Sequence, residues 1–377
     1  MIYRELGNTG LKVSQLGFGA MRLPMVGEGP AAYIDREKAI PIIHRALEAG
    51  VNYIDTAVFY SNNDSQRAVG DAIALWGRRE QLVISTKNHY FGEDEREWWK
   101  NLEQSLVRLR VSYIDLYNFH GLSWKGYQEN VVGRGMGKWM EKAHKQGIIR
   151  HICNSFHDNN DALRKIVDTG FTASVTVQYN MLDRQLEDGI AYARSKGVGV
   201  VVMGPVAGGR LGATSDVLAR LVPGVTHVPE LALRFVLSNP NVTVALSGMS
   251  SLEQVEQNVA TAASEVTLSD QENAAIREHL ERLKAVADSF CTGCRYCLPC
   301  PQEVNIPSIF DKYNWGRAYG LWDPARAGYE NISKVSWEPG KRADACIECG
   351  ACEKKCPQHL PIMKQLKEAH EALKGGG

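Results

Sequence analysis

Residues 51–60 of the chain are VNYIDTAVFY, a short apolar run that ends in Asp55 and continues as a loop to Tyr60. An apolar run of this length, followed by a segment with helical spacing of apolar residues, is typical of a buried strand that leads into a helix. Here the helical segment is Ser65–Leu75, and the next apolar run is Leu82–Lys87. A strand, a helix and a strand in this order predict a parallel βα unit.

The same alternation extends on both sides of this unit, from residue 14 to about residue 285. The predicted strands are Leu16–Ala20, Asn52–Asp55, Leu82–Lys87, Ile114–Phe119, Ile148–Asn154, Val175–Tyr179, Val198–Met203 and Val244–Ser247. The predicted helices between them include Arg36–Ala49, Ser65–Leu75, Glu95–Leu109, Gly137–Gln146, Asp158–Thr169 and Leu186–Lys196. Eight such units in about 270 residues match the size of a (β/α)8 TIM barrel. A doubly wound open sheet is the alternative, although no GxGxxG motif follows the first strand.

Two further segments belong to the predicted barrel. Tyr3–Leu6 and Lys12–Ser14 flank the turn sequence GNTG, which predicts a hairpin that plugs the barrel floor. The glycine-rich stretch VGEGPAAY, residues 26–33, follows the first strand and is predicted to form part of the rim of the barrel mouth.

The charge and hydropathy of the 377-residue chain limit its partners. Lys and Arg number 43, as do Asp and Glu, so no bulk charge favours nucleic acid or an anionic membrane. The N-terminus lacks the pattern of a signal peptide, and no apolar run reaches about 18 residues. These features predict a cytoplasmic protein.

The cysteines are distributed unevenly. Eight of the nine lie between Cys291 and Cys356, and the remaining one, Cys153, is expected to be a packed small residue. In a reduced cytoplasm, clustered thiols are expected to be metal ligands rather than disulfides. The composition changes near residue 286, which predicts a barrel over residues 1–285 and a small metal domain over residues 286–377. Little helical periodicity is evident in residues 291–357, so the metal is expected to hold this domain together.

Polar side chains stand at or just after the ends of consecutive predicted strands: Asp55, Tyr60, Lys87 and His120. The carboxyl ends of parallel barrel strands share one face, which carries the active site of such barrels. The four groups are therefore predicted to meet at one mouth. A purely structural ion pair beside a packed Tyr and His is the alternative.

The motif DTAxxY at Asp55–Tyr60, with Lys87 and DLYNFH at residues 115–120, resembles the aldo-keto reductase superfamily. The opening pattern RELGNTGLKVSQLGFGAMRL at residues 4–23 does so too, and the resemblance extends to about residue 285. It implies a (β/α)8 barrel that transfers hydride between NAD(H) or NADP(H) and a small carbonyl or alcohol. It also implies a catalytic tetrad of Asp55, Tyr60, Lys87 and His120.

Chemistry supports these roles. Tyr60 would act as the acid/base, and Lys87 is expected to lower its pKa. Asp55 would orient the ammonium, and His120 would donate a hydrogen bond to the substrate oxygen.

The same resemblance implies contacts to the cofactor. The matched positions are Ser155, Gln178 and Met203 at the nicotinamide; Gly208, Gly209 and Arg210 at the pyrophosphate; and Gly248, Gln254 and Asn258 at the adenosine. Met203 replaces the usual aromatic platform, and Phe156 replaces an Asn. Gly248 and Gln254 stand where NADPH-preferring members place cations, which favours NADH. Ser250 and Ser251 alternatively cap the helix that starts there.

The cysteines form two groups. The first is CTGCRYCLPCP, with Cys291, Cys294, Cys297 and Cys300; the second is CIECGACEKKCP, with Cys346, Cys349, Cys352 and Cys356. The second matches the bacterial ferredoxin run CxxCxxCxxxCP, and the first is one residue shorter before its last Cys. Two 4Fe–4S clusters are predicted, and a single cluster, zinc or free thiols are the alternatives. By analogy with two-cluster ferredoxins, Cys356 would complete the first set and Cys300 the second. The tail therefore resembles the branch of the superfamily with a C-terminal ferredoxin-like domain.

Three functions are compatible with these patterns. The chain is an NAD(P)H-dependent oxidoreductase, an iron–sulfur electron-transfer adaptor whose barrel is a docking scaffold, or a protein whose tail is a docking or oxygen-sensing module. Hydride carries two electrons and a cluster normally moves one, so an external redox partner protein is one way to connect the two. Candidate substrate contacts at the mouth are Met21, Phe59, His89, Trp124 and Trp139.

Overall fold

The computed structural model describes residues 1–27, 29–213, 215–219, 221–222, 225, 227–264, 268–286, 291, 295, 297–356 and 359–375. Within these residues the chain forms two compact units. One comprises Met1–Ala207 with Ala232–Leu268, and the other comprises Gly208–Leu231 with Ser269–Gly377. The domain boundary near residue 286 stays a prediction, since residues 287–290 lie outside the described ranges.

In the described chain, eight parallel strands close a barrel in the order β10-β11-β12-β3-β6-β7-β8-β9. Their bounds are β3 Leu16–Gly19, β6 Tyr53–Asp55, β7 Val83–Asn88, β8 Ile114–Leu122, β9 Ile149–Phe156, β10 Ser174–Gln178, β11 Gly199–Met203 and β12 Val244–Ser247. Each predicted strand is present to within a few residues. The TIM barrel is thus confirmed, and the open doubly wound sheet is excluded because β3 pairs with both β12 and β6.

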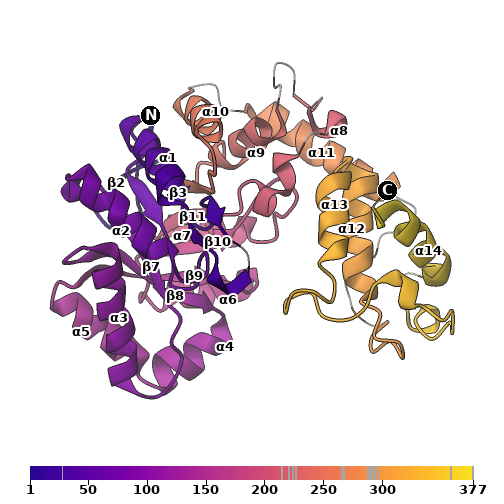
Figure 1. Cartoon of the computed structure of the whole chain (residues 1–377), viewed down its shortest axis with the longest axis horizontal. Coiled ribbons are helices and arrows are strands. Elements are labelled where there is room, and N and C mark those ends of the chain that lie inside the picture. The colour runs from indigo at the N-terminus through magenta and orange to yellow at the C-terminus, as the bar shows by residue number, and fades with distance from the viewer. Residues whose placement is uncertain are drawn as a thin grey trace. The chain divides into compact units, whose positions relative to one another are not determined.

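Helices follow the strands and cover the outside of the barrel, as Figure 1 shows for α1, α2, α3 and α5. Their bounds are α1 Arg36–Glu48, α2 Ser65–Trp76, α3 Glu95–Leu109, α4 Trp124–Gly126, α5 Met136–Lys145, α6 Asn160–Asp168, α7 Glu187–Ser195, α9 Val228–Leu237 and α10 Leu252–Ala263. Side-chain caps set several starts, for example Asp94 on α3 and Asn159 on α6. A π-helix, Tyr127–Gly133, follows α4 and was not predicted.

The N-terminal hairpin plugs one end of the barrel. Strands β1 (Tyr3–Glu5) and β2 (Lys12–Ser14) pair antiparallel, as predicted. Leu6 and Val13 are fully buried and join an apolar cluster with residues of the barrel strands, namely Tyr53, Val83, Leu116, Cys153, Val201, Val244 and Leu246. Cys153 is therefore a packed core residue, as expected. Burial raises the pKa of its thiol to about 12.

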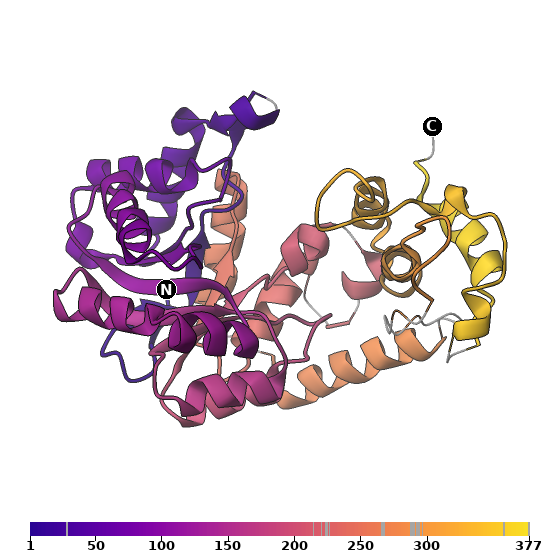
Figure 2. The ribbon, with the colours of Figure 1, turned by 90° about the horizontal axis from the view of Figure 1, so that it is seen from below.

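A second hairpin, which the sequence did not predict, follows β3. Its strands β4 (Met25–Val26) and β5 (Tyr33–Ile34) pair antiparallel around the stretch VGEGPAAY. Gly27 and Gly29 have φ values of +82° and +64°, so the turn needs glycine there. In Figure 2, the early indigo segment that contains this hairpin stands out from the strands of the barrel.

The second unit contains more helix than its sequence suggested. Its helices are α8 Asp216–Ala219, α11 Asp270–Val286, α12 Ile306–Tyr319, α13 Trp322–Glu330 and α14 Ile362–Leu373. α12, α13 and α14 pack around an apolar core that includes Phe310, Tyr329 and Leu366 (Figure 2). The low periodicity of the sequence therefore did not exclude helices or an apolar core in this region. The buried residues of α12 include Lys312 and Asn314 beside Phe310 and Tyr313, so its buried face is not purely apolar in the sequence.

Membrane-spanning helices are absent from the part of the chain that the structure describes. None of its helices is both long enough and apolar enough to cross a bilayer.

The contact between α2 and α3 predicts the outcome of one substitution. A Cβ on Gly70 would lie 2.1 Å from the Arg108 backbone oxygen, so Gly70→Ala forces the two helices apart. We expect a loss of about 1–3 kcal/mol in unfolding free energy, which outweighs the helix propensity of alanine. Thermal unfolding of the full chain measures this as a lower Tm. Leu75→Ala, at a position on α2 that is 68% exposed, should leave Tm nearly unchanged. A higher Tm for Gly70→Ala would contradict the packing described.

Candidate active site and metal centre

A buried ion pair lies at the carboxyl ends of β6 and β7. The Lys87 ammonium is 2.5 Å from Asp55 Oδ1 and also donates to the Thr56 carbonyl oxygen at 3.0 Å. The Ser85 hydroxyl donates to the other Asp55 oxygen at 2.8 Å. Burial is the largest single effect and lowers the pKa of Lys87, but the charges and hydrogen bonds of Asp55 and Tyr60 together outweigh it, so the pKa is raised. Lys87 is therefore charged at neutral pH.

Tyr60, on the loop after β6, lies beside this pair. The Lys87 ammonium is 4.8 Å from the centre of the Tyr60 ring. Burial raises the pKa of Tyr60, and the charge of Lys87 lowers it by less, so the net pKa lies above the ordinary value. The expected lowering by Lys87 is present but does not dominate. The phenol is thus protonated at neutral pH and available as an acid.

His120 completes the group from β8. Its ring is 6.1 Å from the Tyr60 ring, edge to face. Burial, followed by the charge of Lys87 and then by His157 and His89, lowers the pKa of His120 to about 4. The imidazole is therefore neutral at pH 7, with one N–H to donate. The structure brings all four predicted tetrad residues together at one mouth.

The positions predicted for the nicotinamide lie on adjacent strands. Ser155 is on β9, Gln178 ends β10, and Met203 ends β11 directly opposite Gln178. Gly204 has a φ of +65°, and a Cβ there would lie 2.7 Å from Gln178 Nε2. Only glycine leaves room for the Gln178 amide. Gln178 and Met203 therefore lie side by side at the carboxyl ends of adjacent strands.

The positions predicted for the adenosine are occupied by contacts within the chain. Asn258 is buried and donates to Ser247 Oγ at 3.0 Å, which ties α10 to β12. Gln254 accepts from the Ser250 N–H at 2.8 Å, and Ser251 caps α10 through the Gln254 N–H. The helix-capping alternative is thus confirmed for Ser251.

The structure also places a cation near this end that the sequence did not indicate. A Cβ on Gly248 would lie 3.0 Å from Arg22 Cγ, so the Arg22 side chain passes beside Gly248. The two are 226 positions apart in the chain, and only the pairing of β12 with β3 brings them together. The preference for NADH, which relied on the lack of a cation at this position, is weakened accordingly.

Gly208, Gly209 and Arg210 belong to the second unit. The two glycines have φ values of +67° and +95° and bend a short 3-10 segment, Ala207–Gly212. The Arg210 guanidinium lies over the Trp315 ring, 4.2 Å from its centre. This residue therefore has an aromatic partner in its own unit.

The predicted substrate contacts fall into two sets. Met21 and Phe59 are 54% and 56% exposed, and Phe59 packs on His89 with ring centres 3.9 Å apart. Trp139 instead packs against Trp98 of α3, with ring centres 6.2 Å apart, on the helical layer. Trp139 thus lies on α5 rather than on a loop, and this contact packs it between α5 and α3. Trp124 stacks on Tyr127, with ring centres 5.4 Å apart.

Five cysteines of the second unit line one pocket. Its lining includes Cys297, Cys300, Cys346, Cys349 and Cys352, and apolar cover comes from Val304, Ile306, Met363 and Leu366. The Glu348 N–H points at Cys346 Sγ at 3.4 Å, a contact of the kind that tunes cluster thiolates. Thiols from both sequence groups with apolar cover fit an iron–sulfur cluster.

The other three cysteines of the second unit are Cys291, Cys294 and Cys356, and among the described residues neither Cys291 nor Cys356 lines the pocket. Cys291 and Cys356 pack on the same apolar core as the pocket residues. Cys294 lies outside the described residues. Within the described chain, no three Cys, His or carboxylate side chains converge closely enough to hold a single metal ion.

Comparisons with known proteins agree with this architecture. The model of the aldo/keto reductase family matches residues 15–223 and 217–281, and that of the 4Fe-4S dicluster domain matches residues 290–361. The first match spans more than half of the chain, so the protein belongs to the aldo/keto reductase family. It is an oxidoreductase of that family with a fused 4Fe–4S dicluster domain.

Several relatives cover the barrel. L-galactose dehydrogenase of Arabidopsis thaliana is 31% identical and covers 68% of this chain and 86% of its own. NADH-specific methylglyoxal reductase of Escherichia coli (strain K12) is 28% identical, with 74% and 98% covered. A solved aldo-keto reductase of Bacillus halodurans, in its holo form, has a TM-score of 0.64 at 29% identity, with 74% and 96% covered.

The cysteine arrangement predicts the metal content of the protein. Anaerobically purified full-length chain should contain about eight iron and eight sulfide per molecule, as two 4Fe–4S clusters require. Cys349→Ala should remove about half of the iron, because it deletes a predicted ligand that lines the pocket. Cys153→Ala should retain all of it, since Cys153 is packed in the barrel. Unchanged iron in Cys349→Ala, or stoichiometric zinc in the wild type, would contradict this assignment.

Proposed function

We propose that the protein interconverts a small carbonyl compound and its alcohol with NADH or NADPH, and that Tyr60 is the acid/base. The observation that carries this proposal is the buried Asp55–Lys87 pair beside Tyr60 and His120, at the carboxyl ends of consecutive strands.

The nicotinamide dinucleotide, when bound, supplies the hydride. Ser155, Gln178 and Met203 would hold its ring end. The name of the Escherichia coli relative specifies NADH, whereas Arg22 beside Gly248 would suit the extra phosphate of NADPH. Either NADH or NADPH would therefore serve as the hydride donor.

The chain's own residues manage charge and protons at the reacting oxygen. Hydride arrival at a carbonyl carbon leaves negative charge on the oxygen, and Tyr60 can neutralise it with its proton. Lys87, fixed by Asp55, stabilises the phenolate that remains. The neutral His120 donates an N–H toward the same oxygen and orients the substrate.

The two predicted 4Fe–4S clusters would be held by Cys291, Cys294, Cys297 and Cys356, and by Cys346, Cys349, Cys352 and Cys300. The hydride step does not need them, because both electrons travel together. A second role, electron exchange with a redox partner protein, is favoured by the exposure of Cys349 and of Ile347, which is 62% exposed. Under that role one cluster lies close to the protein surface.

Replacement of the proposed acid/base tests the proposal. In Tyr60→Phe, reduction of methylglyoxal with NADH or NADPH should fall about 10²- to 10⁴-fold, since the proton donor is lost. Cofactor binding, followed by fluorescence titration, should persist. Tyr90→Phe is the matched control, because its hydroxyl only accepts the Asp94 N–H at 2.9 Å.

The pH profile adds a second readout. Reduction needs the protonated phenol, and burial raises the pKa of Tyr60. The rate should therefore stay level through neutral pH and fall only above about pH 10. Full turnover by Tyr60→Phe, or failure of the wild type to bind either nicotinamide, would refute the proposal.

A further inference from the structure

The turn directly after Tyr60 has an unusual backbone. Ser61, Asn62 and Asn63 have φ values of +49°, +55° and +66°, in the left-handed region that residues other than glycine seldom adopt. Successive non-glycine residues in this region are unfavourable, so contacts from elsewhere in the fold must hold the turn.

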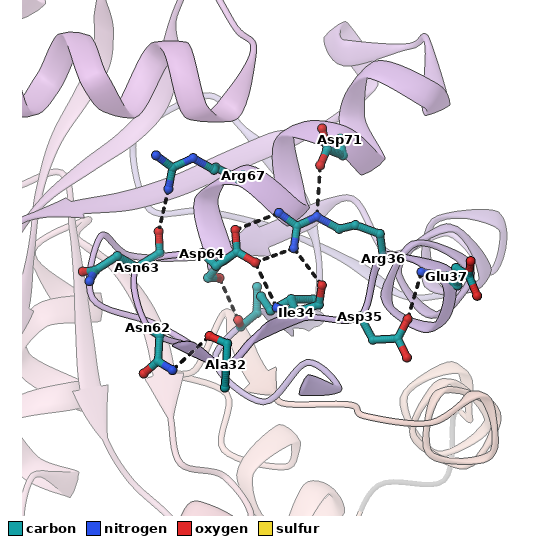
Figure 3. Close-up of polar contacts among 12 residues, drawn as sticks. Ala32, Ile34, Asp35, Arg36, Glu37, Asn62, Asn63, Asp64, Arg67 and Asp71 are labelled. Carbon is teal, nitrogen blue, oxygen red and sulfur yellow. Dashed lines mark hydrogen bonds and ion pairs between the residues drawn. The ribbon is translucent and has the colours of Figure 1, made fainter. Parts of the chain in front are cut away.

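Asp64 ends this turn and does not act as an ordinary helix cap. It occupies the N-cap position of α2, yet the structure shows no hydrogen bond from its side chain to that helix. The carboxylate instead accepts the Ile34 N–H at 2.9 Å and both terminal nitrogens of Arg36, at 2.5 and 2.8 Å (Figure 3). The usual capping contact is replaced by a bidentate contact across the barrel rim.

Arg36, at the start of α1, connects several segments at once. Its Nε donates to Asp71 on α2 at 3.0 Å, and its Nη1 also donates to the Ile34 carbonyl oxygen at 3.0 Å. Figure 3 shows its guanidinium between Asp64 and Asp71. The hydrogen bond from Arg36 holds the pKa of Asp64 below its ordinary value. The pair is therefore charged at neutral pH.

The β4–β5 hairpin contacts the same turn at a second point. The Asn62 amide donates to the carbonyl oxygens of Gly29 and Ala32, at 2.9 and 3.0 Å. The Ser61 hydroxyl donates to the Met21 carbonyl oxygen at 3.3 Å. The left-handed turn is thus fixed to the segment that follows β3.

We propose that Asp64 and Arg36 are positioning residues for Tyr60, which hold the left-handed turn so that the phenol stays beside Lys87. This inference rests on the proposed function, in which Tyr60 is the acid/base. Because proton transfer depends on placement to within about an ångström, loss of the Asp64–Arg36 pair should impair the chemical step more than cofactor binding.

The test uses Asp64→Asn, which keeps an oxygen for the Ile34 N–H and removes the charge that pairs with Arg36. In the full-length holoprotein, kcat for methylglyoxal reduction should fall about 10- to 100-fold, while the NADH Kd stays within about twofold. Arg36→Gln should lose at least as much kcat, since it also removes the contacts of Arg36 to Asp71 and to the Ile34 carbonyl oxygen. The double variant should be no worse than Arg36→Gln, since each single variant already breaks the Asp64–Arg36 contact.

Arg45→Gln is the matched control. Arg45 lies on the same helix and makes a comparable bidentate pair with Glu256 of α10, at 2.5 and 3.0 Å, away from the Tyr60 turn. Its kcat should equal that of the wild type. An unchanged kcat in Asp64→Asn with a lowered Tm would show a merely structural pair and overturn the inference.

A readout independent of turnover separates this inference from the proposed function. With carbon-13-labelled tyrosine, the Tyr60 resonance is identified by its loss in Tyr60→Phe, and its titration is followed by NMR. In Asp64→Asn the pKa of Tyr60 should move toward that of a free tyrosine, and in Arg45→Gln it should not. If the wild type shows no turnover, the proposed function fails, but the NMR titration still tests the positioning role. A changed pKa of Tyr60 in Asp64→Asn supports that role, and an unchanged pKa overturns it.

Discussion

The buried pair between Asp55 and Lys87 is the interaction on which the site depends. Two charges removed from water carry a large desolvation cost, which is offset only when the pair is close and its remaining hydrogen-bonding groups are satisfied. The pair is close in this barrel, at 2.5 Å. The Ser85 hydroxyl satisfies the second Asp55 oxygen, and the Thr56 carbonyl accepts a further hydrogen bond from Lys87. These contacts form because β6 and β7 are adjacent parallel strands that end at one edge. Removal of one partner would leave a lone buried charge, which typically costs about 3–5 kcal/mol.

Much of this architecture could be predicted from the sequence. The barrel strands are short apolar runs at regular intervals, so their number and order follow from the alternation with helices. The tetrad follows next, since parallel strands in a barrel direct their carboxyl ends to one face. The two groups of cysteines, at spacings that match ferredoxin ligands, indicated a cluster domain in the same way.

The features of the fold and site that the sequence did not predict depend on contacts between segments that are distant in the chain. The β4–β5 hairpin has strands of two residues, which are too short to show alternation. Arg22 approaches Gly248 only because the barrel closes between β12 and β3. The pKa of Tyr60 is set by a balance in which burial exceeds the effect of Lys87, and burial is a property of the folded chain. Asp64 has the sequence position of a plain helix cap, and only the folded chain turns its carboxylate toward Arg36.

In the proposed function, the protein joins a site for two-electron hydride transfer to a domain whose predicted clusters would transfer one electron at a time. In the proposed function, the barrel alone carries out carbonyl reduction. A single-turnover experiment with NADH carrying deuterium at the transferable C4 position, and with methylglyoxal, tests this most directly. Deuterium is expected on the new carbinol carbon of the product, with no change in the electron paramagnetic resonance of the clusters. Cluster reduction by NADH, with no deuterium in the product, would contradict a reaction confined to the barrel.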